Sequence, residues 1–463
     1  MTGGQGISGN LPTATRTGKR VWLYPDRRTG KNATVRRRLA LALLIVYLLT
    51  PWLVWSGRPI LRFDIHEGVA YAFGIVLRLN EASLLAFFFI GMALILFLAT
   101  TIRGRIWCGY ACPQTVFVEW VIRPIEEWFE GPAHRRRIAD RGPITWELRF
   151  RKGVKHIAFL IVAAVVANSF LSYFIAPQSL IHWMLRPPSE HPSAFAAMSF
   201  VLLAFYADLA WFREQFCAFV CPYARFQSVL FDRDTPAVAY DSARGDPRGK
   251  GSEKGDCIDC GLCVRVCPTG IDIRNGAQLE CIMCARCVDA CDSIMSNLSR
   301  RTGLIRLASE RELSSEGEAQ KSWFELGVFL RPRVIVYAAS TLLVAGLAMW
   351  RVASRPRLAM TVTRVQGVAY SRLPDGGLAN LFNIRMVNNT DKPLPMKVEV
   401  NEPPGTTILC GACEADVLAP YQDRVVSVLV RIPDGFSGPS QIVFRFVGTG
   451  DLGISTLLYP SPR

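Results

Sequence analysis

Two closely spaced cysteine runs constrain this chain more than any other feature. The first is Cys257-x2-Cys260-x2-Cys263-x3-Cys267-Pro268, and thirteen residues separate it from the second, Cys281-x2-Cys284-x2-Cys287-x3-Cys291. This spacing is typical of a segment that folds around two [4Fe-4S] clusters, because three cysteines of each run surround one cluster and the fourth binds the other. We therefore expect one cluster on Cys257, Cys260, Cys263 and Cys291, and the second on Cys281, Cys284, Cys287 and Cys267.

The runs could also form zinc sites or a disulfide framework. Zinc sites usually combine two C-x2-C hooks and do not need a third cysteine at the same spacing. Disulfides are rare in a reducing cytoplasm. The second run ends in Cys291-Asp292, without the proline that follows the first. That difference removes no ligand, so the sequence favours two bacterial-ferredoxin-type clusters.

Long apolar stretches predict an α-helical membrane protein. Half of the residues are hydrophobic, and a helix needs about 20 mainly apolar residues to cross the hydrocarbon layer of a membrane. The net charge of +15 gathers beside these stretches, so no nucleic-acid partner is expected. We expect five transmembrane helices, at about 39–57, 84–102, 154–175, 194–212 and 333–350.

Basic residues set the expected orientation. Lys and Arg collect in cytoplasmic segments, and they are abundant in the 1–38 tail and in loop 103–153, whereas Arg186 is the one Lys or Arg in loop 176–193. The N-terminus and the segment 213–332 are therefore expected in the cytoplasm. With five spans, the C-terminus lies across the membrane.

A C-x3-C-P motif follows the second and the fourth predicted span. The motifs are Cys108-Gly-Tyr-Ala-Cys112-Pro113 and Cys217-Ala-Phe-Val-Cys221-Pro222. A spacing of four puts two side chains on one helix face, which the proline would end or kink. The repeat suggests an internal duplication whose four thiols converge on copper or on another soft-metal or redox centre. The alternative is that these cysteines are small apolar fillers.

The end of the chain has a different pattern. Short alternating runs such as MTVTRV and VVSVLVRI, separated by turn residues, predict an antiparallel β-sandwich of immunoglobulin type over 355–463. Cys410 and Cys413 there could be a disulfide, a metal hook or free thiols. The expected domains are the 1–38 basic tail, a 39–232 four-helix membrane region, the 233–300 ferredoxin-like domain, a 301–332 linker, the 333–350 helix and the 355–463 domain.

Three segments carry a resemblance to a known family. Trp107-Cys-Gly-Tyr-Ala-Cys-Pro-Gln-Thr, Tyr240-Asp-Ser-Ala-Arg-Gly-Asp-Pro-Arg-Gly and Cys267-Pro-Thr-Gly-Ile-Asp-Ile-Arg resemble the CcoG/FixG/RdxA family, accessory proteins of cbb(3)-type cytochrome c oxidase. The resemblance implies an electron-transfer protein of the bacterial inner membrane with a periplasmic C-terminal domain. It further implies a cupric reductase that reduces Cu(II) to Cu(I) for the oxidase copper centre, with oxidase assembly factors or copper chaperones as partners. On this reading Cys108, Cys112, Cys217 and Cys221 bind or pass copper, or bind a further metal centre.

Two different functions remain open from the sequence. The chain could be a quinol-oxidising membrane polyferredoxin subunit that feeds a respiratory reductase. It could also be a non-redox scaffold for oxidase assembly, whose clusters are merely structural. The β-rich C-terminal domain favours the accessory function over the polyferredoxin subunit.

Overall fold

The chain forms two compact units, Met1–Leu347 and Ala348–Arg463. The structure is a computed structural model. It describes residues 20–65, 68–78, 82–251, 253–276, 278, 280–314, 326–365, 371–374, 378–390, 392–396, 398–402, 406–409, 416–431, 440–446 and 452–458. The first unit contains the long helices and the cysteine motifs, and the second is built from strands.

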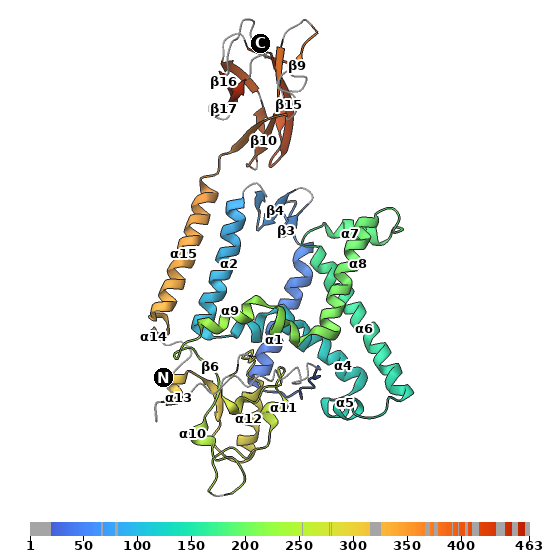
Figure 1. Ribbon diagram of the computed structural model, residues 1–463, viewed down its shortest axis with the longest axis vertical. Coiled ribbons are helices and arrows are strands. Elements are labelled where there is room, and N and C mark those ends of the chain that lie inside the picture. The colour runs from blue at the N-terminus through green and yellow to red at the C-terminus, as the bar shows by residue number, and fades with distance from the viewer. Residues whose placement is uncertain are drawn as a thin grey trace. The chain divides into compact units, whose positions relative to one another are not determined.

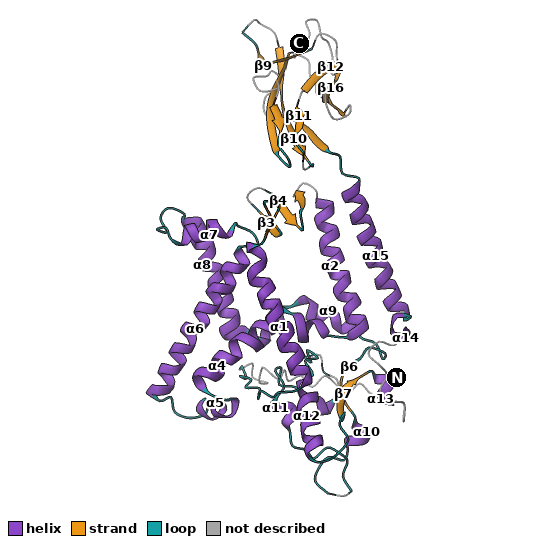
Figure 2. Ribbon diagram, turned by 180° about the vertical axis from the view of Figure 1, so that it is seen from behind, coloured by secondary structure: helices purple, strands orange, loops and turns teal. Residues whose placement is uncertain are grey.

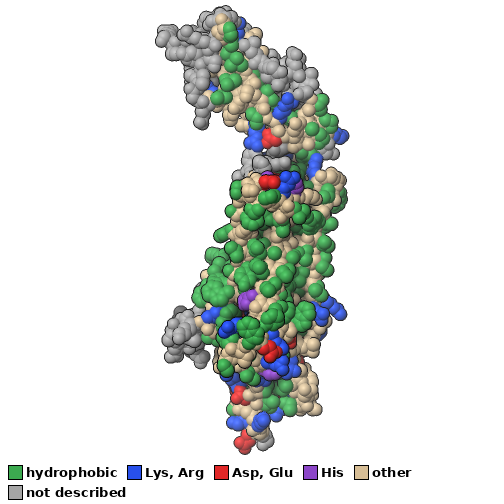
Figure 3. Space-filling view, turned by 90° about the vertical axis from the view of Figure 1, so that its right-hand side faces the viewer, with side chains coloured by type: hydrophobic (Ala, Val, Ile, Leu, Met, Phe, Trp, Pro, Cys, Tyr) green, Lys and Arg blue, Asp and Glu red, His purple; other side chains and the backbone are tan. Residues whose placement is uncertain are grey.

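Long helices dominate the first unit (Figure 1). They are α1 (Lys31–Leu49), α2 (Ala82–Arg103), α6 (Trp146–Leu171), α8 (Pro192–Ala207) and α15 (Pro332–Ala353). Four helical segments are long and apolar enough to cross a membrane: Ser83–Arg103, Trp146–Leu171, Pro192–Phe212 and Pro332–Ala353. The face in Figure 3, which is the side of α6 and α8, carries a broad band of hydrophobic side chains, as lipid contact requires. The chain is therefore an integral membrane protein, as the sequence predicts.

The first predicted span, 39–57, is shorter in the structure. α1 ends at Leu49 and is followed by a 3-10 turn and the hairpin β1 (Val54–Trp55) and β2 (Arg58–Pro59). Pro51 has no N–H to bond to the carbonyl of Tyr47, so it stops the helix. The hydroxyl of Tyr173 donates to that carbonyl instead, at 2.9 Å. The first half of α1 is also basic, which leaves too few apolar residues for the segment to count among the four spans above.

A shared core joins α1, α6 and α8 to the segment after the first cysteine motif. Phe159 and Leu209 are buried in it, and the ring of Tyr47 packs edge-on against that of Phe117 at 5.5 Å. Tyr47 also donates its hydroxyl to the carbonyl of Val166, at 2.8 Å. The connecting helices are α3 (Pro113–Phe117), α4 (Arg123–Glu130), α5 (Ala133–Ala139) and α9 (Pro222–Leu230).

The two ends of the helices carry different structures (Figures 1 and 2). At one end lie α7 (Pro177–Met184) and an antiparallel sheet of β3 (Leu61–Asp64), β4 (Val69–Ala72) and β5 (Ile75–Arg78). At the other end lies the ferredoxin-like segment. The described residues of 58–65 and 68–78 form β2 to β5 and turns, so none of them adds a helix to the bundle.

The ferredoxin-like segment is closed by a strand pair. β6 (Ala237–Tyr240) pairs antiparallel with β7 (Ile305–Ala308), and between them lie α10 (Ser242–Gly245), α11 (Leu262–Arg265) and α12 (Arg286–Asn297). β7 belongs to the predicted 301–332 linker, so that linker begins as part of this domain. The short helices α13 (Glu310–Ser314) and α14 (Leu326–Phe329) follow.

Part of the predicted basic tail is ordered. The backbone N–H of Asp26 donates to the carbonyl of Arg265 at 2.9 Å, and Arg27 pairs with Glu127 at 3.0 Å. Tyr24 donates its hydroxyl to Asp140. The basic, Gly- and Thr-rich composition of 1–38 predicts a mostly disordered tail, but acidic side chains on α4 and at the end of α5 contact Arg27 and Tyr24 and hold this part of it.

The second unit is a β-sandwich. One sheet contains β8 (Leu358–Arg364), β9 (Ser371–Arg372), β10 (Leu378–Asn388), β13 (Thr407–Leu409) and β15 (Asp423–Arg431), and a second contains β12 (Val398–Glu402), β16 (Ser440–Phe446) and β17 (Leu452–Leu458). A further pair joins β11 (Leu394–Met396) to β14 (Asp416–Leu418). Phe382 and Phe444 meet edge-on in the core, at 5.5 Å. The sandwich confirms the predicted fold, and Cys410 and Cys413 lie outside the described residues.

Candidate iron-sulfur and thiol sites

The first cysteine run folds around a small cavity. Cys257 and Cys260 reach it from the loop that leads into α11, Cys263 reaches it from α11, and Cys291 reaches it from α12. Apolar side chains such as Ile294 and Leu304 complete the wall. We refer to this cavity as the first cluster site.

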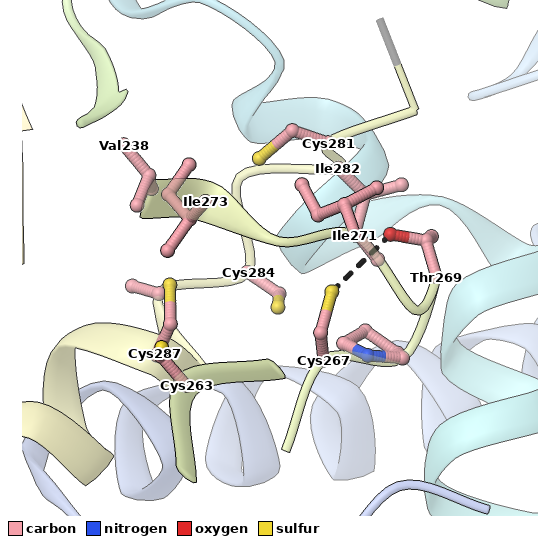
Figure 4. Close-up of a pocket in the computed structure, with 12 residues that line it drawn as sticks. Val238, Cys263, Cys267, Thr269, Ile271, Ile273, Cys281, Ile282, Cys284 and Cys287 are labelled. Atoms are coloured by element: carbon pink, nitrogen blue, oxygen red, sulfur yellow. Dashed lines mark hydrogen bonds between the residues drawn. The ribbon is translucent and has the colours of Figure 1, made fainter. Parts of the chain in front are cut away.

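A neighbouring small cavity is lined by Cys267, Cys281, Cys284 and Cys287, and we refer to it as the second cluster site. Figure 4 shows these side chains around the hollow, with the sulfur atoms of Cys267 and Cys284 pointing toward one another. The sulfur of Cys267 lies 3.4 Å from the hydroxyl of Thr269. Cys263 also lines this cavity, so the two sites are adjacent.

The two cysteine loops have the same backbone. Asp259 and Gly261 flank Cys260 with φ of 55° and 63°, and Met283 and Ala285 flank Cys284 with φ of 54° and 55°. Left-handed conformations are unfavourable for residues with a side chain, so three of them at matching positions are imposed by what the loops surround. Each loop turns about a centre and continues into a helix, α11 or α12. Each hollow is lined by the four thiols that one cluster needs, and Cys263 borders both hollows, so the two sites fit two [4Fe-4S] clusters.

Burial controls the ionisation of these cysteines. It raises the pKa of Cys263 to about 11 and the pKa values of Cys281 and Cys291 to about 12, and neighbouring thiols contribute to the increase. Metal ligation requires the deprotonated form of cysteine. These thiols therefore release their protons when a positively charged centre binds to them. All twelve cysteines within the described ranges are free of disulfides, and no three His, Cys, Asp or Glu side chains there are arranged around a single metal ion.

The two C-x3-C-P motifs also have matching structures. Each lies on a five-residue π-helical turn, Trp107–Ala111 or Phe216–Val220, and its second cysteine is extended. Each turn ends just before the extended cysteine that precedes the proline, as the proline predicts, and the proline then begins the next helix, α3 or α9. The sequence predicts an α-helical pair of thiols, but the π-turn sets their separation.

The four thiols of these motifs lie close enough to interact, and we call them the four-thiol site. Burial raises the pKa of Cys108 to about 12, with further increases from Cys112 and Cys221. The pKa of Cys217 is also raised, first by burial and then by Cys112, Cys108 and Cys221. Cys108 donates to the buried side chain of Gln227 at 3.7 Å. These four partly buried thiols are the ligand type that soft cations such as Cu(I) prefer.

The four-thiol site adjoins the second cluster site. The residue after Cys108 is Gly109, and a Cβ there would lie 2.6 Å from the carbonyl oxygen of Ile282 and 3.0 Å from that of Met283. The backbone N–H of Arg105 points to the sulfur of Met283 at 3.0 Å, and its guanidinium to the carbonyl of Cys281 at 3.5 Å. The first motif and the second cysteine loop are therefore in direct backbone contact.

Buried ion pairs hold this junction together, and sequence reasoning missed them. Glu119 pairs with Arg123 and, at 2.8 Å, with Arg286, while Arg123 donates to the carbonyl of Pro268 at 3.1 Å. Burial alone would raise the pKa of Glu119, but Arg123 and Arg286 outweigh it and lower that pKa. The sequence feature that could have indicated the Glu119–Arg123 pair is the i, i+4 spacing of these two residues within an otherwise apolar stretch.

Three family models match the chain. A "4Fe-4S dicluster domain" matches residues 212–254 and 248–310, and a "4Fe-4S binding domain" matches 85–136. The family "IG-like fold at C-terminal of FixG, putative oxidoreductase" matches 348–456. The chain is therefore an iron–sulfur protein with an immunoglobulin-like domain, and both C-x3-C-P motifs fall within regions that 4Fe-4S families match.

Three curated relatives match over most of their length. Protein RdxA of Cereibacter sphaeroides is 34% identical over 80% of each chain. Protein RdxB of the same organism is 33% identical over 85% of this chain and 84% of its own. The nitrogen fixation protein FixG of Rhizobium meliloti is 30% identical over 90% of this chain and 87% of its own.

Proposed function

The chain belongs to the FixG/RdxA family of membrane iron–sulfur electron-transfer proteins, and we propose that its electrons reduce Cu(II) to Cu(I) for assembly of a cbb(3)-type cytochrome c oxidase. One observation carries the proposal. A group of four partly buried thiols, the ligand type that selects Cu(I), touches the backbone of the second cluster site through Gly109.

The chain's residues divide into two roles in this proposal. When bound, the [4Fe-4S] clusters supply single electrons at low potential. Cys108, Cys112, Cys217 and Cys221 hold copper, which gains one electron as Cu(II) becomes Cu(I). A one-electron donor protein replaces each electron that leaves.

Location and partners follow from the charge pattern. The arginine-rich 103–153 loop and the cluster sites lie at the same end of the helices, which we assign to the cytoplasm. The chain then resides in the bacterial inner membrane, with its C-terminal domain in the periplasm. Oxidase assembly factors or copper chaperones would receive the Cu(I).

The test is anaerobic reoxidation of the purified full chain. The clusters are first reduced with dithionite, the excess is removed, and Cu(II) or a quinone is added while the cluster absorbance is followed. We expect Cu(II) to reoxidise the clusters faster than quinone does. A variant with Cys108, Cys112, Cys217 and Cys221 replaced by alanine should keep its iron and acid-labile sulfide but lose the fast reaction with Cu(II). Alanine at Cys410 and Cys413 is the matched control and should leave the reaction unchanged.

Three outcomes would reject the proposal. Faster reoxidation by quinone would indicate the quinol-linked polyferredoxin function. Normal oxidase assembly without added copper in a strain whose protein lacks both clusters would indicate a scaffold. Loss of the clusters in the four-alanine variant would show that these thiols do not form a separate site.

A further inference from the structure

We propose that the two cluster sites act in series, so that electrons arrive at the first site and leave from the second across the contact between Gly109 and the Ile282–Met283 peptide. This inference rests on the proposed function and assigns a direction to the electron path. It follows from differences between the two sites in exposure, charge and position.

The first site is the one open to a donor. Cys260, in its loop, is exposed to solvent, whereas Cys284 of the second site is buried. Asp259 beside Cys260 is also exposed, with 59% of its side chain accessible. A soluble one-electron donor protein can therefore approach the first site at the Cys260 loop. The segment that carries the first C-x3-C-P motif covers the second site at the loop between Cys281 and Cys284.

Charge favours electron movement toward the second site. Arg36 is buried and donates through Nε, at 2.7 Å, to the carbonyl of Gly109, the residue that lies against the second cysteine loop, while its two terminal nitrogens have no hydrogen-bond partner among the described residues. Arg286, which lies between Cys284 and Cys287 in the sequence, is also buried, and it shares with Arg36 the single carboxylate of Glu119, whose pKa both cations lower. At the first site the cation of Arg274 is instead neutralised by Asp272, at 2.7 Å, and by Asp259. Buried positive charge stabilises an added electron, so the second site should have the higher reduction potential.

The contact of the second site with the first C-x3-C-P motif determines where the electron leaves. Gly109 follows Cys108 directly and lies against the backbone between Cys281 and Cys284, with no room for a Cβ. Gly104, with φ of 62°, makes a second close approach, since a Cβ there would lie 2.7 Å from the sulfur of Met283. Electron transfer slows exponentially with distance, so these two glycines keep the second site close to the four thiols. Gly109 is a positioning residue, because it need not bind copper or iron itself.

One readout needs no copper. In an anaerobic redox titration of the full chain followed by EPR, we expect two reduction potentials. Replacing Arg36 with Met should lower the higher potential and leave the lower one in place, because it removes a buried cation near one site. Arg27→Met, which removes an exposed arginine, is the control and should change neither. If Arg36→Met moves the lower potential, or both equally, the proposed order is wrong.

A second readout uses Gly109→Ala. The added methyl group must push the cysteine loop away, so reoxidation by Cu(II) should be about tenfold slower or worse, while reduction by dithionite and iron content stay normal. Gly153→Ala is the matched control, because nothing lies within 4 Å of a Cβ at that position. An unchanged rate in Gly109→Ala would overturn the path. If the unmodified chain does not reduce Cu(II), the proposed function fails, and the EPR titration still decides the order of the two sites.

Discussion

The carboxylate of Glu119 lies 2.8 Å from the guanidinium of Arg286, and both side chains are buried. Glu119 comes from the segment that follows the first C-x3-C-P motif, and Arg286 begins the helix that carries Cys287 and Cys291. The pair therefore joins the membrane helices to the ferredoxin-like segment. Arg123 adds a second link, because it contacts Glu119 and the carbonyl of Pro268 together.

The first prediction concerns this junction. Glu119→Gln keeps the shape of the side chain but leaves the buried cations of Arg123 and Arg286 without their shared counterion. Removing one partner of a buried pair costs about 3–5 kcal/mol. We expect the iron–sulfur absorbance in detergent to be lost at a lower temperature than in the unmodified chain.

A surface pair provides the control for Glu119. Glu127 pairs with Arg27 at 3.0 Å, and more than a third of each side chain is exposed. Water and salt screen such a pair, so Glu127→Gln should change the stability by about 1 kcal/mol or less. Equal melting shifts in the two variants would show that the Glu119–Arg286 pair does not hold the junction.

The sequence was sufficient to identify the cysteine pattern but not the junction around it. Iron–sulfur chemistry fixes the spacing within the two runs, so the runs predict the loops and the fold that they form. Gly109 and Arg286 gave no such signal, because their roles depend on contacts between residues more than 150 positions apart. The end of α1 was also missed, since an apolar composition does not reveal that Pro51 stops the helix.

The second prediction compares two glycine-to-alanine changes. Gly261 has a φ of 63°, where a side chain costs about 1–2 kcal/mol, so Gly261→Ala should destabilise the first cluster site. Gly153 lies inside α6, where alanine is favoured over glycine by about 0.5–1 kcal/mol. Thermal release of iron should therefore shift downward for Gly261→Ala and should not shift downward for Gly153→Ala. A downward shift in both, or in neither, would contradict the conformational argument.

The third prediction concerns the start of α1. Asp289 on α12 accepts hydrogen bonds from the backbone N–H groups of Asn32 and Ala33, at 3.2 and 2.9 Å, and from the Asn32 side chain at 2.8 Å. It therefore caps α1 from another part of the chain. Asp289→Ala should cost about 1–2 kcal/mol, because the freed N–H groups lose an anionic acceptor at a helix start.

Limited proteolysis measures this cap. With α1 loosened, trypsin should cleave at Arg27, Arg28 or Lys31 faster in Asp289→Ala than in the unmodified chain. Asp289→Asn keeps an acceptor oxygen and should fall between the two. Identical cleavage rates in all three proteins would show that the cap does not hold the N-terminal segment.

The fourth prediction tests the separation of the two units. Phe444 is fully buried against Phe382, at 5.5 Å between ring centres. Truncating a buried phenylalanine costs about 3–5 kcal/mol, so Phe444→Ala should destabilise the β-sandwich strongly. The chain divides at residue 347, so iron content and the EPR spectrum should stay normal. Loss of iron in this variant would show that the sandwich supports the cluster sites.

The fifth prediction assigns a potential to a site. The hydroxyl of Thr269 lies 3.4 Å from the sulfur of Cys267, which lines the second cluster site (Figure 4). A hydrogen bond to a ligand sulfur favours the more negative, reduced state, so its removal lowers the reduction potential. Thr269→Val should therefore lower one of the two potentials in the EPR titration, whereas Thr269→Ser, which keeps the hydroxyl, should leave it nearly unchanged. The reduction potential that Thr269→Val lowers belongs to the second site. The series order requires this potential to be the higher of the two, and Arg36→Met should lower the same one. If Thr269→Val and Arg36→Met lower different potentials, the buried charge of Arg36 does not act on the second site.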